Sequence, residues 1–319
     1  MVTKIAIIGA GFVGATTAYA FMLGNTAQEI VLIDKNREKA IGEAMDLSHG
    51  APFVSPVHIY AGDYADCRGA KAVVITAGAA QMPGQSRLQL TETNSKIIQE
   101  VVEGVLTYNP NPILIVVTNP VDIMAYVAWK VSRLPASRVI GSGTVLDTSR
   151  FRHLLSKHCC IDPRNIHAYV IGEHGDSEVL LWNSVNLAGI SLEKFCSHCS
   201  HRCSCDNKQK IEQKVREAAY EVIRGKKATY YAVALALRRI TESILRDERS
   251  ILTVSTFVED IYGVKDLFLS LPCILGKNGV ENIVPIELND EERHLFLESA
   301  KIIKNNLPFH SGKAAPLML

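Results

Sequence analysis

Short runs of β-branched and other apolar residues alternate with amphipathic segments along the first half of the chain. The apolar runs predict strands at residues 5–8, 30–33, 57–60, 72–76, 113–117 and 139–140. The segments between them have a helical period and predict helices over residues 13–23, 38–47, 88–106 and 121–131. Strands that are apolar throughout are typical of parallel sheets covered on both faces. The first half therefore predicts an α/β fold with a doubly wound parallel sheet.

The pattern changes in the second half. It predicts a helix over residues 147–158, strands near 167–171, a long helical stretch over 208–245, β-structure over 250–286 and a last helix over 290–306. Asn289 precedes three acidic residues, which suits the start of that last helix. We expect an α+β domain here. The domains are predicted as 1–142 and 143–319, without a long linker between them.

Composition places the chain among ordinary globular proteins. Its 319 residues are 47% hydrophobic and 21% charged, and 34 Lys and Arg face 33 Asp and Glu. A net charge of +1 gives no general attraction to nucleic acid or to a membrane surface. The apolar run at 5–8 is too short for a signal peptide, and no stretch approaches the ~20 apolar residues of a membrane helix. We expect a soluble cytoplasmic protein whose eight cysteines are not a disulfide framework.

A glycine pattern follows the first predicted strand. Gly9, Gly11 and Gly14 form GxGxxG at the point where a strand ends and a helix begins. Such a turn lets a backbone approach a pyrophosphate and directs the helix N-terminus at it. Asp34 ends the second strand 20 residues after Gly14 and suits the two hydroxyls of an adenine ribose, whereas it would repel a 2′-phosphate. The sequence therefore favours NAD over NADP, the alternative being a turn that binds nothing or another nucleotide.

Three residues of the second half carry candidate chemistry. His174 lies in the glycine-flanked segment 171–177, and histidine exchanges protons near neutral pH, as carbonyl reduction requires. Asp147 and Arg150 share one segment at a predicted helix start. Taken singly, each has an ordinary explanation: a loop histidine, a helix N-cap and a solvated helix charge.

Four segments together change that balance. The stretches at 9–14, 118–122, 146–150 and 171–177 resemble the lactate/malate dehydrogenase family, in order and over nearly the whole chain. The resemblance implies a Rossmann NAD-binding domain followed by a substrate domain. It further implies that His174 gives a proton to pyruvate and takes one from lactate, that Asp147 orients the imidazole, and that Arg150 binds the substrate carboxylate. The cofactor-binding residues expected from the glycine pattern and the resemblance are Gly9, Gly11, Val13, Gly14, Asp34, Lys39, Tyr64, Gly78, Ala79 and Asn119.

The segment 78–86 interrupts the periodicity and predicts a mobile loop. The resemblance places Gln81 against the variable end of the substrate and Arg87 against the reacting carbonyl. Gln81 supplies no charge for a second carboxylate, so pyruvate is favoured over oxaloacetate, and a malate dehydrogenase is the nearest rival. Gln85 departs from the family, where Glu is usual. Asn119 and Thr229 match substrate-pocket positions of the family, the alternatives being an ordinary turn residue for Asn119 and helix packing for Thr229.

Two cations suggest regulation. Arg152 and His167 match the positions through which bacterial members of the family bind fructose 1,6-bisphosphate as an activator. The same resemblance implies a homotetramer. The simpler interpretation is two exposed cations without a ligand.

A cysteine cluster is not explained by the family. Cys196, Cys199, Cys203 and Cys205 alternate with histidines, yet their spacing is not that of a zinc finger. We expect no metal there. Two other classes stay open: a nucleotide-binding sensor without catalysis, and a metal-dependent interaction module built on the cluster.

Overall fold

A mixed sheet runs through the molecule. The computed structural model describes residues 3–79, 87–198 and 208–308, in which nine strands form this sheet in the order β14-β13-β12-β6-β5-β4-β1-β2-β3. The neighbours from β3 to β6 are parallel, while β12, β13 and β14 are antiparallel. The strands are β1 (Lys4–Ile8), β2 (Glu29–Ile33), β3 (His58–Ala61), β4 (Ala72–Ile75), β5 (Ile113–Val116), β6 (Val139–Gly141), β12 (Ser250–Val258), β13 (Leu267–Gly276) and β14 (Gly279–Ile283). The order 3-2-1-4-5-6 is that of a Rossmann sheet, which confirms the predicted doubly wound fold.

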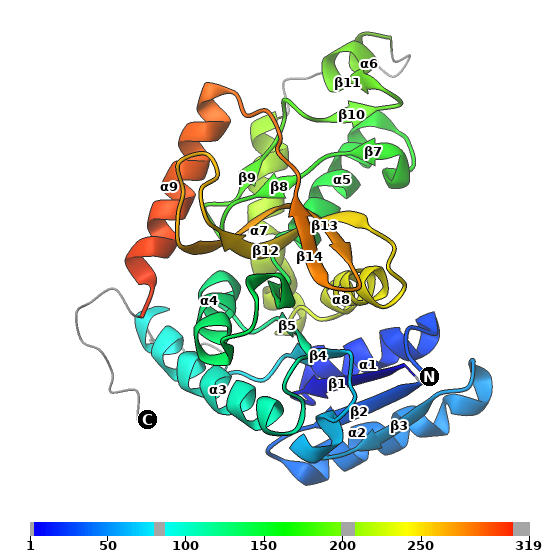
Figure 1. The fold of residues 1–319 in the computed structure, drawn as a ribbon. Coiled ribbons are helices and arrows are strands. Elements are labelled where there is room, and N and C mark those ends of the chain that lie inside the picture. Colours follow the sequence, from blue (N-terminus) through cyan, green and yellow to red (C-terminus); the bar gives the residue numbers. More distant parts are fainter. Residues whose placement is uncertain (1–2, 80–86, 199–207, 309–319) are drawn as a thin grey trace.

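Helices cover the sheet and link its two halves. Helix α1 packs against α8, although the two are far apart in sequence, and α3 packs against α4 (Figure 1). The helices are α1 (Phe12–Gly24), α2 (Arg37–His49), α3 (Arg87–Tyr108), α4 (Val121–Ser132), α5 (Val145–Cys159), α6 (Leu192–His198), α7 (Lys208–Lys226), α8 (Tyr231–Leu245) and α9 (Asp290–Asn306). Short 3-10 turns, η1 (Ala51–Phe53), η2 (Tyr64–Cys67), η3 (Ala136–Arg138) and η4 (Pro163–Asn165), fill connections.

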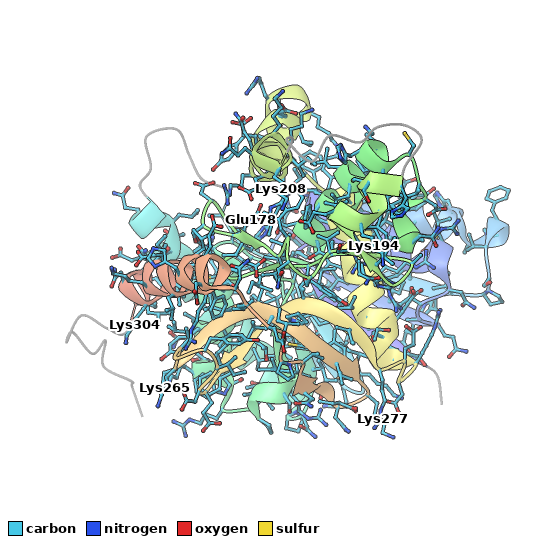
Figure 2. The ribbon with its side chains drawn as sticks, turned by 90° about the horizontal axis from the view of Figure 1, so that it is seen from above. Glu178, Lys194, Lys208, Lys265, Lys277 and Lys304 are labelled. Carbon is cyan, nitrogen blue, oxygen red and sulfur yellow. The ribbon has the colours of Figure 1, made fainter. Side chains whose placement is uncertain are left out.

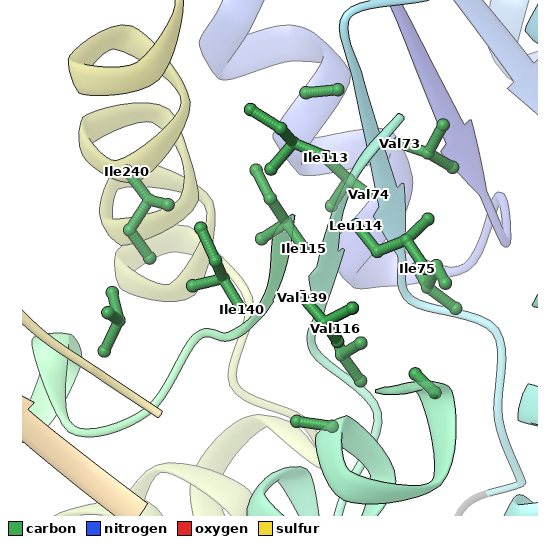
Figure 3. Packing of buried hydrophobic residues seen from close by; sticks show 14 of the residues in the cluster. Val73, Val74, Ile75, Ile113, Leu114, Ile115, Val116, Val139, Ile140 and Ile240 are labelled. Atoms are coloured by element: carbon green, nitrogen blue, oxygen red, sulfur yellow. The ribbon is translucent and has the colours of Figure 1, made fainter. Parts of the chain in front are cut away.

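The core lies on both faces of the parallel strands. All residues of β4 and β5 are buried, as expected for strands that helices cover on both sides. Figure 3 shows their branched side chains packed together, with Ile240 of α8 beside Ile140 of β6. A second cluster around Phe151 and Leu155 supports the other half of the molecule. Burial of these apolar side chains, at roughly 25 cal/mol per Å², is the main stabilising contribution.

The second half adds an antiparallel layer and small sheets. Strand β12 continues the central sheet through the pairing of Ser255 with Gly141 of β6. A Cβ on Gly141 would lie 2.7 Å from Ser255 Cβ, so this crossing requires glycine. The sheet thus runs across the predicted boundary at 142/143, and that boundary stays a prediction. The short strands are β7 (Ile166–His167), β8 (Val170–Ile171), β9 (Val179–Leu180), β10 (Asn186–Leu187) and β11 (Ile190–Ser191).

Two elements differ from the sequence prediction. The helical stretch over 208–245 is two helices, because residues 227–230 leave the helix and Lys227 has a φ of 72°. The strand expected near 167–171 is two short strands in different sheets, β7 with β10 and β8 with β9. Periodicity alone did not find either break, because the helical period continues past Gly225, which lies two residues before Lys227, and no glycine or proline lies between β7 and β8.

Candidate active site

The glycine turn between β1 and α1 is shaped for close backbone approach. Gly9 has a φ of 105°, and a Cβ there would lie 2.7 Å from the Ala77 nitrogen. A Cβ on Gly14 would lie 1.8 Å from the Gly9 carbonyl oxygen, so helix and strand pack directly on each other. A Cβ on Gly11 would meet no protein atom within 4 Å. This open side, at the N-cap of α1, is where a dinucleotide phosphate would fit, and Val13 follows half-buried in the first turn.

Asp34 lies beside this turn at the end of β2. Its Oδ2 accepts the Ala10 N–H at 2.7 Å, and its Oδ1 accepts the Asn36 N–H at 2.9 Å. Each carboxylate oxygen retains a further lone pair for a ribose hydroxyl. Lys39 follows in the first turn of α2 and is exposed, whereas Tyr64 packs its ring against Gly104 of α3.

Asn94, which the sequence did not point to, joins two loops that carry predicted cofactor residues. Its side chain accepts the Ala79 N–H at 2.8 Å and donates to the Asn119 carbonyl at 2.7 Å. Gly78 packs directly against Thr118, since a Cβ at position 78 would lie 2.4 Å from the Thr118 methyl carbon. Asn94 is buried on α3, so it fixes the ends of β4 and β5 relative to that helix.

His174, Asp147 and Arg150, which are separated in sequence, form one hydrogen-bonded group. His174 Nδ1 lies 2.6 Å from Asp147 Oδ2, and Arg150 Nη1 donates to Asp147 Oδ1 at 2.7 Å. The Asp147 side chain is 2% exposed and the His174 side chain 25% exposed. The carboxylate is therefore enclosed by two cationic partners, while the imidazole still reaches the cavity.

The electrostatics of the pair favour a charged imidazole. Burial opposes the charge of His174, but the Asp147 carboxylate outweighs burial and raises the pKa of His174 to about 9. Burial likewise opposes the charge of Asp147, yet His174 and Arg150 hold its pKa below the usual value. The site is thus prepared to donate a proton at neutral pH.

Asp122 holds the histidine segment from behind. Its Oδ2 accepts the His174 backbone N–H at 2.8 Å, and its Oδ1 accepts the Ser255 hydroxyl at 2.6 Å. Burial raises the pKa of Asp122 to about 6 despite these hydrogen bonds. The backbone just before His174 is also fixed, because Gly172 forms an antiparallel bridge with Ser270 of β13. Asp122 was not predicted as a site residue, although it belongs to the segment 118–122 that carries the resemblance.

A cavity of about 250 Å³ opens in front of the imidazole. Its walls come from the first turns of α3, α4 and α5, the histidine segment, α7 and α9. Among the described residues, the charged and polar side chains that line it are Thr91, Asn119, Asp147, Arg150, Glu173, His174, Asp176, Glu178, Arg216, Tyr220 and Asn306.

Three predicted substrate residues stand outside this group. Gln81 lies outside the described residues, and Arg87 begins α3 with a side chain that is also outside them. Thr229 lies between α7 and α8 and is not among the described residues that line the cavity. The next residue, Tyr230, stacks on Phe12 of the glycine turn with ring centroids 5.4 Å apart, so Thr229 is close to the cofactor side of the site.

The predicted effector residues lie elsewhere. Arg152 donates to the Ala168 carbonyl at 3.0 Å and packs over the Tyr169 ring. It lines a second cavity of about 510 Å³, together with His153, Arg164 and Arg239. His167 is exposed on β7 and is not among the described residues that line this cavity.

Two further searches concern metals and membranes. Over residues 3–79, 87–198 and 208–308, no three His, Cys, Asp or Glu side chains are grouped to hold a metal ion. Cys199, Cys203 and Cys205 lie outside these ranges, so the fate of the cysteine cluster is untested. Within the same part of the chain, no helix has the length and apolar character needed to span a bilayer.

The sequence matches two family models that together span most of the chain. Residues 3–141 match the NAD binding domain of lactate/malate dehydrogenases, and residues 144–312 match their alpha/beta C-terminal domain. L-lactate dehydrogenase 1 of Clostridium acetobutylicum is 55% identical over 305 residues, covering 96% of this chain and 97% of the relative. L-lactate dehydrogenase of Thermoanaerobacterium saccharolyticum is 54% identical over 301 residues, covering 94% and 97%.

Solved structures have the same fold. A lactate dehydrogenase from a Medee basin deep-sea metagenome library superposes with a TM-score of 0.93 at 45% identity, covering 96% of this chain and 98% of its own. The minor L-lactate dehydrogenase of Enterococcus mundtii, in a ligand-bound form, superposes with a TM-score of 0.93 at 41% identity and equal coverage.

Proposed function

Because the chain belongs to the lactate/malate dehydrogenase family, we propose that it interconverts pyruvate and L-lactate with NAD as the cofactor. The observation that carries this proposal is the His174–Asp147–Arg150 group, which faces a cavity next to the NAD-binding domain. When bound, NADH supplies the hydride that reduces the substrate carbonyl carbon. The protein's own residues must bind the substrate, exclude water and move one proton.

His174 is the acid/base group of this proposal. Asp147 occupies Nδ1, so Nε2 is the ring nitrogen left for the substrate. As hydride reaches the carbonyl carbon of pyruvate, the carbonyl oxygen takes the proton from Nε2, and the imidazole becomes neutral. In the reverse direction, neutral Nε2 takes the hydroxyl proton of lactate. The raised pKa of His174 keeps the proton available for pyruvate reduction at neutral pH.

Arg150 binds the substrate carboxylate. Its Nη1 is engaged by Asp147, which leaves other N–H groups of the planar guanidinium for two parallel hydrogen bonds. Lysine could not reproduce that geometry. Asn119, Thr229 and Arg87 complete the proposed substrate site, with Arg87 contacting the carbonyl oxygen of the substrate.

Gln81 carries the choice between substrates. An uncharged side chain at this position gives no partner for the second carboxylate of oxaloacetate, so pyruvate is the better substrate. The names of the relatives support the same choice. A malate dehydrogenase is the alternative, and a sensor without catalysis is disfavoured because binding alone needs no group such as His174–Asp147–Arg150.

Steady-state assays test the function. NADH oxidation with pyruvate should exceed that with oxaloacetate in kcat/KM, and a preference for oxaloacetate would reject the lactate assignment. His174→Asn should lower kcat for pyruvate by about 10²-fold or more while NADH binding persists. Retained activity would reject the role of His174, and absence of turnover with every 2-oxo acid in the unchanged protein would favour the sensor.

An effector site is a second part of the proposal. Arg152 and His167 together would bind fructose 1,6-bisphosphate as an activator, and the cationic lining of the cavity beside Arg152 supports an anionic ligand. Adding the bisphosphate at subsaturating pyruvate should raise the rate, and Arg152→Gln should remove the increase. An unchanged rate in the parent protein would exclude this regulation.

Assembly and location complete the proposal. We expect a homotetramer, and the apolar side chains exposed on several helices support an assembly. We also expect the protein in the cytoplasm.

A further inference from the structure

Glu178 is a buried carboxyl group inside the active-site cavity. It stands four residues after His174 and directly before β9, is 3% exposed and lines the cavity. Its Oε1 has no hydrogen-bond partner among the described residues. In Figure 2, Glu178 lies inside the outline of the molecule, whereas Lys265, Lys277 and Lys304 lie at its edge. Burial of a carboxyl group with one oxygen lacking a hydrogen-bond partner disfavours the anion.

The charges around Glu178 come from three elements. Helix α5 supplies Asp147 and Arg150, the histidine segment supplies His174, and α7 supplies Arg216. Burial, followed by the Asp147 carboxylate, raises the pKa of Glu178 to about 8, although the three cations act against this rise. At neutral pH the side chain is therefore mainly an uncharged acid.

Arg216 does not neutralise Glu178. It donates from Nη2 to the Glu178 backbone carbonyl at 3.3 Å, and its Nη1 lies 3.9 Å from Glu212 Oε2. Its Nε is buried and has no acceptor among the described residues. The guanidinium thus lies between the Glu178 backbone and Glu212 of its own helix, and no ion pair to the Glu178 carboxyl is formed within the described part of the chain.

We propose that Glu178 is a positioning residue that sets how much positive charge His174 and Arg150 present to the substrate. As an uncharged acid, Glu178 leaves both cations to the anionic substrate. As an anion, it competes for their charge and repels the substrate carboxylate, so pyruvate binds more weakly. This inference rests on the proposed roles of His174 and Arg150, and it predicts a KM effect rather than a loss of chemistry.

The pH dependence of KM separates Glu178 from His174. Half a pH unit above 8, about three quarters of Glu178 would be ionised, so the KM for pyruvate should rise about four-fold between pH 7 and pH 8.5. Glu178→Gln keeps the shape of the neutral acid and removes this ionisation. Its KM should change less than about two-fold over the same range, with kcat at pH 7 within about three-fold of the parent. Glu217→Gln, an exposed change on α7, is the matched control and should behave as the parent.

Infrared spectroscopy gives a readout that does not need turnover. A protonated carboxylic acid band that Glu178→Gln lacks should be present in the parent enzyme at pH 7 and should decrease toward pH 8.5. Arg216→Gln should move this loss to higher pH, because a cation that favours the anion is gone. If Glu178→Gln does not fold, as judged by its melting transition and NADH binding, the titration of the parent and of Arg216→Gln still decides the question.

Two results would overturn the proposal. One is the same rise of KM in the parent and in Glu178→Gln. The other is a parent spectrum without a titrating carboxylic acid between pH 7 and pH 8.5. Failure of the acid/base role of His174 would be seen separately, as retained turnover in His174→Asn. That outcome would not change the infrared titration of Glu178 in the parent enzyme.

Discussion

At the scale of single residues, the hydrogen bond between Asp147 and His174 Nδ1 leaves Nε2 as the ring nitrogen for the substrate in the proposed mechanism. The same carboxylate accepts from Arg150, so it orients the proposed proton donor and the proposed carboxylate-binding group together. Asp122 adds a third constraint through the His174 backbone N–H. The imidazole is thus positioned before the substrate arrives, which lowers the reorganisation needed during proton transfer.

Replacing Asp147 by Asn should show how far the pKa of His174 depends on the Asp147 carboxylate. Without the Asp147 carboxylate, only the weaker contributions of Asp122 and Glu178 oppose the effect of burial on His174, so its pKa should fall by more than one unit from about 9. A raised imidazole pKa stabilises the fold below about pH 6.5, and this contribution is lost as pH rises through 9. Asp147→Asn should therefore lower the melting temperature at pH 6 more than at pH 10. The kcat/KM for pyruvate should decline from a lower pH and be about 10²-fold smaller at pH 7.

Asp162→Asn is the control for this change. Asp162 is paired with Arg164 at the surface, so its removal should leave the pH profile in place. An unshifted profile in Asp147→Asn would contradict the role given to the Asp147 carboxylate.

Sequence motifs identified some of these residues and missed others for a physical reason. Asp147 and His174 have side chains whose chemistry is informative wherever they lie. In the sequence, Asp122 is an ordinary acidic residue in the first turn of a helix. Its hydrogen bond to the His174 backbone joins residues that are 52 positions apart in the sequence. Asn94 and Glu178 likewise acquire their roles only from burial beside distant segments. Such roles come from tertiary packing, which spacing along one chain does not contain.

At the scale of elements, buried strands were the most predictable feature. Runs such as those of β4 and β5 are apolar throughout because helices cover both faces, and this requirement is visible in sequence. The junction between α7 and α8 was not visible. Lys227 has a positive φ there although it is not a glycine, Gly225 lies two residues earlier inside α7, and contacts such as the Phe12–Tyr230 stack accompany the break. Tertiary contacts overrode local propensity at this point.

The glycine turn offers a sharp test at the element scale. In Gly14→Ala, the new Cβ would lie 1.8 Å from the Gly9 carbonyl, so β1 and α1 must separate and the N-terminus of α1 must shift. We expect NADH affinity to fall by at least about ten-fold, with the melting temperature lowered by several degrees. Fluorescence titration with NADH and thermal unfolding would measure both.

Gly42→Ala is the matched control for that test. Gly42 is also helical, but a Cβ there would meet nothing within 4 Å. Alanine in an open helical position should stabilise α2 slightly, by up to about 1 kcal/mol. Equal NADH affinity in Gly14→Ala and the parent would show that the turn tolerates the displacement and would weaken its assignment to the cofactor.

At the scale of the whole molecule, one sheet joins the two halves through β6 and β12, and residues of both halves line the cavity in front of His174. The first half supplies the NAD-binding turn, and the second supplies His174, Asp147 and Arg150. Apolar side chains nevertheless remain exposed on the outer surfaces of helices from both halves. They are Tyr19 and Leu23 of α1, Ile41 and Met45 of α2, Val222 and Ile223 of α7, and Tyr231 and Leu235 of α8.

These surfaces make the assembly testable. Leu235 is 58% exposed on α8 and also lines the second cavity beside Arg152, so a subunit contact there would adjoin the proposed effector site. A buried, unpaired carboxylate is costly in an interface, so Leu235→Asp should shift a tetramer to smaller species in sedimentation velocity. Leu295→Asp, on the 42% exposed Leu295 of α9, should leave the assembly unchanged. If Leu235→Asp sediments as the parent does, α8 does not contribute to the assembly. If it dissociates, activation by the bisphosphate should be lost as well, because the contact at Leu235 adjoins the proposed effector site.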